Sequence, residues 1–125
     1  MKIRIKGNSV RYRLTQGEVK TLGTTGFLAE ETCFGPGEEQ TFTYALQTKD
    51  GIDGLEATFH SGKITLFIPS AAAKIWPGED RVGFENKVEV APGVSLSLLL
   101  EKDFACLDNT QEDQADHYPN PKAVC

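Results

Sequence analysis

The sequence has few cysteines, few histidines and no long apolar segment. Its 125 residues include three cysteines, Cys33, Cys106 and Cys125, and two histidines. An odd and sparse cysteine set argues against the disulfide framework of a small secreted protein, so we expect reduced thiols. No apolar run approaches the ~20 residues that a membrane helix needs. The N-terminus alternates charged residues with Ile, unlike a secretory signal. We therefore expect one compact domain over residues 1–125, in the cytoplasm and without a membrane partner.

Recognisable catalytic motifs are also missing. His60 and His117 are the only histidines, and the chain has neither a G-x-S-x-G elbow nor a Gly-Lys-Ser/Thr phosphate loop. We expect no enzyme and no cofactor. One enzymatic hypothesis stays open, in which Cys106 is a nucleophile paired with His117. A cysteine between Ala105 and Leu107 is more typical of a small buried apolar residue.

The C-terminal segment, residues 104–125, is rich in metal-binding residue types. These are Cys106, Asp108, Glu112, Asp113, Asp116 and His117. The segment lacks the calcium loop with its central glycine and any paired C-x-x-C or H-x-x-x-H spacing. We expect no metal site, with Cys106, Asp108 and His117 as weak candidates, and interpret the segment as an irregular acidic tail.

The rest of the chain carries a weak internal repeat. A shift of 54 positions aligns KIRIKGNSVRYRLTQGEVKTLG with EATFHSGKITLFIPSAAAKIWP, and TFTYALQ with SLSLLLE. Identities are few, but the apolar positions coincide. Ile3, Ile5, Val10, Tyr12 and Leu14 align with Ala57, Phe59, Ile64, Leu66 and Ile68. This agreement favours a duplication over a chance match of common patterns.

Each half has the pattern of a hairpin, a short helix and a second hairpin. Alternation predicts strands at 2–6 and 9–14 around Gly7-Asn8, and at 56–60 and 63–68 around Ser61-Gly62. Further strands are expected at about 27–34, 41–48, 81–89 and 94–103. The unit is ββαββ, with repeat one at about 2–50 and repeat two at about 56–103.

Helix signals follow each first hairpin. Thr15 and Glu18 form a capping-box pattern, and Gly23 is expected to end this helix. Pro69 suits the first turn of the second helix, which Pro77-Gly78 should end. Trp76 could cap a ligand pocket, but a core position beneath its hairpin is favoured.

The sequence therefore predicts an α+β fold. We expect mostly antiparallel β-strands with two short helices, in tandem ββαββ repeats related by pseudo-two-fold symmetry. The architecture is expected to be swapped-hairpin or open-barrel-like.

Positive charge is concentrated at the start of the chain. The net charge is −5, but residues 1–25 hold six basic residues and one acidic residue. With Gly7-Asn8 as the turn, the cross-strand pairing places five of the six basic residues on one face of the first hairpin: Lys2, Arg4, Lys6, Arg11 and Arg13. Like charges directly opposite on a sheet are destabilising, so an anion on this face would be stabilising.

Three anions are considered for this face. Carboxylates of the same chain are the first, either Glu101 and Asp103 or the acidic residues of the tail. A small phosphate or carboxylate ligand is the second, since arginine offers bidentate donors. Nucleic acid is the third, but the short helix after the hairpin has mixed charge and supplies no base-reading surface.

Two families resemble this chain. The stretches MKIRIKGNS, TYALQ and EKDFACLDNTQEDQADHYPNP resemble those of a small bacterial family known only as a domain of unknown function, over nearly the whole chain. This resemblance implies no activity.

A second resemblance is local. The motif residues Lys2, Ile5, Gly7, Asn8, Ser9, Arg13, Val19, Leu22 and Gly23, with Ile68, Pro69, Ala73 and Ile75, resemble the swapped-hairpin transition-state regulators and antitoxins. That resemblance implies a ββαββ half-unit and DNA binding. The second half departs from it, with Glu56, Thr58 and His60 where the first half has Lys2, Arg4 and Lys6.

Function is left largely open by these features. We expect a small non-enzymatic cytoplasmic binding or interaction protein that binds anions on its first hairpin. The alternative is a DNA-binding regulator or antitoxin-like protein acting as a fused pseudo-dimer. A small anion or a protein partner is favoured over nucleic acid.

Overall fold

The computed structural model describes residues 1–104 and 118, which form eight strands, two α-helices and two short 3-10 turns. The strands are β1 (Lys2–Lys6), β2 (Ser9–Leu14), β3 (Phe27–Cys33), β4 (Thr41–Lys49), β5 (Glu56–His60), β6 (Lys63–Pro69), β7 (Gly83–Ala91) and β8 (Val94–Lys102). The helices are α1 (Gln16–Thr25) and α2 (Ser70–Ile75), and the 3-10 turns span Glu38–Gln40 and Trp76–Gly78. The predicted order of elements is confirmed.

The predicted hairpins form, and the first has the register expected from its turn. Lys2 pairs with Arg13 and Arg4 with Arg11 across the turn at Gly7-Asn8. Gly7 has φ 56°, a left-handed value that glycine adopts without strain. Local alternation and turn residues are sufficient to set these pairings, because a hairpin register depends on its own turn.

The strands form two four-stranded sheets, ordered β1-β2-β8-β7 and β3-β4-β6-β5. Here they are called sheet A and sheet B. Each first hairpin pairs with the second hairpin of the other half, so that β2 runs parallel to β8 and β4 parallel to β6. Four of the six pairings in the described residues are antiparallel. The fold is α+β with two short helices, as expected, and most pairings are antiparallel. Each sheet is nevertheless mixed because it contains one parallel pairing, and the described residues form no closed barrel.

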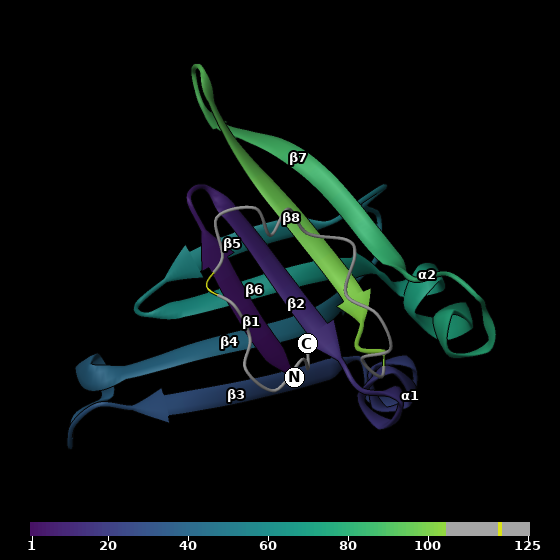
Figure 1. The fold of residues 1–125 in the computed structure, drawn as a ribbon, viewed down its shortest axis with the longest axis horizontal. Coiled ribbons are helices and arrows are strands. Elements are labelled where there is room, and N and C mark those ends of the chain that lie inside the picture. Colours follow the sequence, from purple (N-terminus) through teal and green to yellow (C-terminus); the bar gives the residue numbers. More distant parts are fainter. Residues whose placement is uncertain (105–117, 119–125) are drawn as a thin grey trace.

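The inner faces of the sheets enclose the core, and the two helices lie together at one end of the sheets (Figure 1). Alternation on β2 turns Val10, Tyr12 and Leu14 inward, where they are buried. The other members of the buried core come from β4, β6, β8, the helices and nearby loops: Leu46, Leu66, Ile68, Leu98, Leu100, Val19, Leu22, Leu55, Ala73 and Trp76. The two sheets thus share one core.

Helix α1 begins as predicted and ends later than predicted. Thr15 and Glu18 form the capping box, with the Glu18 amide donating to Thr15 Oγ1 at 3.3 Å and the Thr15 amide to Glu18 Oε1 at 2.8 Å. The helix does not end at Gly23 but continues to Thr25, and Gly26 caps it with φ 79°. A Cβ on Gly23 would lie 3.1 Å from the carbonyl oxygen of Ala73. Gly23 therefore lets the two helices approach closely.

Trp76 occupies the core, as favoured from the sequence. It is fully buried, and its indole N–H donates to the carbonyl of Arg81 at 2.9 Å. Its ring packs edge-on against Phe84, with centroids 5.1 Å apart.

Among the described helices, none is long and apolar enough to cross a membrane.

Candidate anion-binding face

Sheet A carries the predicted cations on its outer face. Because Val10, Tyr12 and Leu14 point into the core, their neighbours Arg11 and Arg13 point outward. The cross-strand partners of these neighbours on β1 share that face. We call the five residues Lys2, Arg4, Lys6, Arg11 and Arg13 the basic face. The structure brings all five together.

The parallel pairing with β8 extends this face into rows that cross the sheet. One row runs Lys2, Arg13, Glu101, and the next runs Arg4, Arg11, Leu99. Neighbouring strands lie about 4.8 Å apart, so residues in one row are in direct reach of each other. The row of Lys2 and Arg13 therefore contains a carboxylate, and the row of Arg4 and Arg11 continues into an apolar side chain.

Two of the expected internal carboxylates lie on this face. Glu101 Oε1 is 3.4 Å from Arg11 Nε and 3.7 Å from Arg13 Nε. Asp103 Oδ2 is 3.0 Å from Lys2 Nζ, whose side chain is 75% exposed. Ion pairs that are partly exposed to solvent contribute at most about 1 kcal/mol each. The carboxylates therefore partly neutralise Lys2, Arg11 and Arg13.

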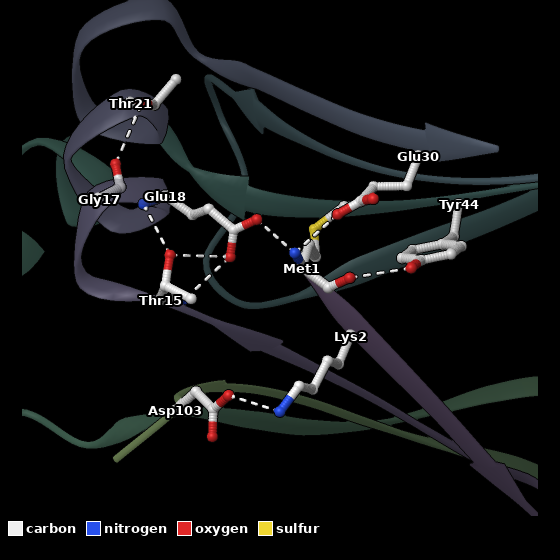
Figure 2. A network of polar contacts seen from close by, with 9 residues as sticks. All are labelled: Met1, Lys2, Thr15, Gly17, Glu18, Thr21, Glu30, Tyr44 and Asp103. Carbon is white, nitrogen blue, oxygen red and sulfur yellow. Dashed lines mark hydrogen bonds and ion pairs between the residues drawn. The ribbon is translucent and has the colours of Figure 1, made fainter. Parts of the chain in front are cut away.

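A polar network holds the start of β1 in place (Figure 2). The amino group of Met1 donates to Glu18 of α1, and to Glu30 of β3 at 2.7 Å. The carbonyl of Met1 accepts from the Tyr44 hydroxyl at 2.8 Å. Because these partners lie on α1 and sheet B, the network ties the edge strand of the basic face to the rest of the molecule.

The same network shifts three pKa values. Burial alone would lower the pKa of the Met1 amine, but hydrogen bonds and charges from Glu18 and Glu30 outweigh it and raise that pKa. Burial would raise the pKa of Glu18, and the amine together with Thr15 lowers it. The pKa of Tyr44 is raised by burial and by the nearby charges of Glu30 and Glu18. The amine and Glu18 thus stabilise each other's charged forms.

Sheet B presents a different outer face. Its β5–β6 hairpin, the first hairpin of the second half of the chain, has Glu56 opposite Phe67 and Thr58 opposite Thr65. A cation on this sheet, Lys49, lies 5.1 Å from the centre of the Phe67 ring and 3.3 Å from Glu56. The two sheets have related strand orders but carry different charge on their outer faces.

The remaining predicted site residues belong to the C-terminal segment. Cys106, Asp108 and His117, and the acidic residues of the tail, lie outside the described residues. Among the residues that are described, no group of three or more His, Cys, Asp or Glu side chains could hold a metal ion. His60 is exposed on β5, on sheet B.

Three polar residues on this face of sheet A were missed by the sequence analysis. Ser97 on β8 lies beside Ser9 on β2, and Lys87 on β7 lies beside Ser97. The alternation of these residues with apolar residues predicts the strands, but no local sequence pattern predicts that β2 lies beside β8. The parallel pairing is what places them near the basic face.

Comparison with known proteins identifies a family but no relative of known activity. Searches of curated proteins and of solved structures return no match. A family model described as a family of unknown function, DUF7009, matches residues 1–122. Because this match spans nearly the whole sequence, including all of the candidate face, the chain belongs to the DUF7009 family.

Proposed function

We propose that this protein is a non-enzymatic binding protein that holds an anionic ligand on the outer face of sheet A. The observation that carries the proposal is the register of β1 and β2, which sets Arg4 opposite Arg11 and Lys2 opposite Arg13. Such like-charged pairs cost some tenths of a kcal/mol each. Two carboxylates on β8 and just after it, Glu101 and Asp103, offset part of that cost. An external anion would offset more of it.

The composition of the face supports binding rather than catalysis. The basic face supplies guanidinium and ammonium donors. The β8 residues in the same rows include no histidine or cysteine. Guanidinium and ammonium groups recognise carboxylate and phosphate but cannot exchange protons near neutral pH. The cytoplasm remains the proposed location, in keeping with the sparse cysteines and the free, exposed Cys33.

We also infer that the two halves are tandem ββαββ repeats related by a pseudo-two-fold axis. The parallel registers support this. Val10 pairs with Leu98, and Ile64 pairs with Tyr44. A shift of +54 takes Val10 to Ile64, and a shift of −54 takes Leu98 to Tyr44. The same shift of 54 therefore converts one pair into the other. The sheet orders β1-β2-β8-β7 and β5-β6-β4-β3 are likewise equivalent under this exchange.

The exchange of first hairpins also supports a second candidate, a DNA-binding regulator of the swapped-hairpin type. Each first hairpin completes a sheet begun by the second hairpin of the other half. In this chain only the first half carries the cations, since the second has Glu56, Thr58 and His60 on β5. Fold likeness does not carry function, so this candidate ranks below the small-anion proposal.

A titration with tripolyphosphate in 50 mM salt, measured by calorimetry, tests the leading proposal. The double variant Arg11→Gln/Arg13→Gln should bind at least about tenfold more weakly, because two charge-assisted contacts are lost. Glu101→Gln should bind more tightly, because an internal competitor is removed. The control Lys49→Gln/Lys63→Gln makes the same charge change on sheet B and should leave affinity unchanged.

Two results would decide against these candidates. Equal loss of affinity in the sheet A and sheet B variants would mean that only net charge matters, and the proposal would be wrong. For the DNA candidate, a short duplex should bind at 50 mM salt and dissociate by about 200 mM. Failure of the duplex to bind at 50 mM salt would exclude it.

A further inference from the structure

We propose that a row of four residues across sheet A, Lys6, Ser9, Ser97 and Lys87, binds the phosphate group of a small phosphomonoester. We call these residues the serine row. The inference rests on the proposed function and narrows it, since it names both the place on the face and the chemical class of ligand.

The register places the four residues in line, one on each strand. Lys6 on β1 pairs with Ser9 on β2, Ser9 with Ser97 on β8, and Ser97 with Lys87 on β7. Cross-strand partners point to the same side of a sheet, and their strands are about 4.8 Å apart. Two hydroxyls therefore lie side by side at the centre, with an ammonium group on either flank.

These donors are available to a ligand. Within residues 1–104 and 118, the Ser9 and Ser97 hydroxyls make no hydrogen bond, and Lys6 and Lys87 make no ion pair. Both lysines are exposed, and both serines are half-buried. A lysine has a flexible four-carbon stem, so each ammonium can lean toward the central hydroxyls.

The centre of the row is held in place by the adjoining turn. The side-chain amide of Asn8 donates to the carbonyl of Ser95 at 2.6 Å, and the Ser97 amide donates to the carbonyl of Asn8 at 3.0 Å. These contacts fix the end of the first hairpin to β8. Because these contacts hold the backbone of Ser9 and Ser97, a ligand would not have to order the strands that carry the two hydroxyls.

A phosphomonoester matches this set of donors. At neutral pH it carries a charge of about −1.5 to −2 and three terminal oxygens. Two ammonium groups balance the charge, and two hydroxyls can donate to oxygens between them. A carboxylate has one charge and two oxygens, so it would leave part of the row unused.

Neighbouring acids confine the site to a single phosphate. Glu85 and Glu89 lie two residues before and after Lys87, on the same face of β7. They would repel a phosphate chain running along that strand. A polyanion such as DNA is therefore disfavoured at this row, and a small ligand with one phosphate group is favoured.

The corresponding row of sheet B provides an internal comparison. A shift of 54 takes Lys6 to His60 and Ser9 to Lys63, and Lys63 pairs with Thr43. Thr43 in turn pairs with Glu31 on β3. This row thus holds one lysine and one carboxylate in place of two lysines, and we do not expect it to bind phosphate.

The test is a titration of the full chain with phenyl phosphate at pH 7.5, in which binding is monitored by amide NMR chemical shifts. Shifts should centre on residues 6, 9, 87 and 97, and Ser9→Ala/Ser97→Ala should raise Kd at least about tenfold. The control Thr43→Ala/Thr58→Ala removes two hydroxyls from sheet B and should leave Kd unchanged. Dimethyl phosphate, with one charge, should bind at least about tenfold more weakly.

The outcomes separate this inference from the proposed function. If phenyl phosphate binds equally well to wild type and to Ser9→Ala/Ser97→Ala, the serine row is not its site. Should the serine variant fail to fold, Lys6→Gln/Lys87→Gln changes only exposed residues and must show the same loss. If tripolyphosphate binds through Arg11 and Arg13 while phenyl phosphate does not bind, only the narrower inference fails. If neither ligand binds, both fail.

Discussion

Glu18 links two functions at the scale of a single residue. It caps α1 through Thr15, and it accepts a hydrogen bond from the Met1 amine at the start of the basic face. Glutamine also serves at this position of a capping box. The variant Glu18→Gln therefore keeps the cap and removes the charge that pairs with the amine, which isolates the contribution of the ion pair.

We predict that Glu18→Gln lowers the free energy of unfolding by about 1 kcal/mol near pH 6 to 7. The pKa of Glu18 is lowered by folding, so its contribution holds above the ordinary glutamate pKa and is lost as pH falls through the folded value. The pKa of the amine is raised, so its contribution holds below the ordinary amine pKa and is lost as pH rises through the folded value.

Urea unfolding of both proteins across this pH range measures the difference. The two stabilities should converge at both low and high pH. Glu38→Gln, an exposed carboxylate on a 3-10 turn, is the charge-matched control and should show little change. A stability difference that does not vary with pH would show that Glu18 acts through packing instead.

The contact between α1 and α2 sets a constraint at the scale of elements. We predict that Gly23→Val destabilises the protein by about 2 kcal/mol, because its Cβ would lie 3.1 Å from the Ala73 carbonyl and 3.4 Å from Pro77 Cγ. Gly17→Val is the matched control in the same helix, where a Cβ meets nothing within 4 Å. It should change stability by less than about 0.5 kcal/mol. Denaturant unfolding compares them, and equal losses would refute the close-contact explanation.

Gly23 also illustrates which features of an element a sequence can reveal. A glycine near the end of a helical pattern is typical of a C-cap, which led to the early predicted end of α1. The true cap, Gly26, lies three residues later, with left-handed φ. Whether a glycine ends a helix or admits a neighbouring helix depends on distant residues such as Ala73. Hairpins were predictable because their turns lie within them.

The sequence predicts those parts of the candidate site that depend on local strand pairing, but not those that depend on pairing between distant strands. Arg4 opposite Arg11 followed from the local turn at Gly7-Asn8. Ser97 and Lys87 became neighbours of the first hairpin only through the parallel pairing of β2 with β8, which joins residues almost 90 positions apart. No local pattern encodes that pairing, so half of the serine row could not be identified from the sequence.

Each sheet combines a hairpin from the first half of the chain with one from the second half, and this leads to a prediction about the whole molecule. If the chain is divided between Gly51 and Ile52, in the exposed loop between β4 and β5, each fragment keeps only one half of each sheet. We predict that fragments 1–51 and 52–125 are unfolded or self-associated when separate. Mixed, they should form a 1:1 complex with micromolar or tighter affinity, because both sheets and the shared core are then completed.

Light scattering and circular dichroism of the separate and mixed fragments provide the measurement. The control is a chain divided within the β5–β6 turn, between Ser61 and Gly62. This cut removes the covalent link between two adjacent strands of sheet B and leaves both hairpins of sheet A intact. A folded monomer of fragment 1–51 alone would contradict the prediction, since β1 and β2 would then not need β8.

The contrast between the outer faces of the two sheets has an evolutionary consequence. In a dimer of identical chains, every substitution appears twice, so a residue that improves one face also alters its symmetric copy. Here the exposed residues Arg4 on β1 and Thr58 on β5 occupy the same place relative to the turns of the two first hairpins, yet they are separate codons. Selection can therefore refine the charge of one face without disturbing the other, and a single chain can acquire two independent surfaces on one scaffold.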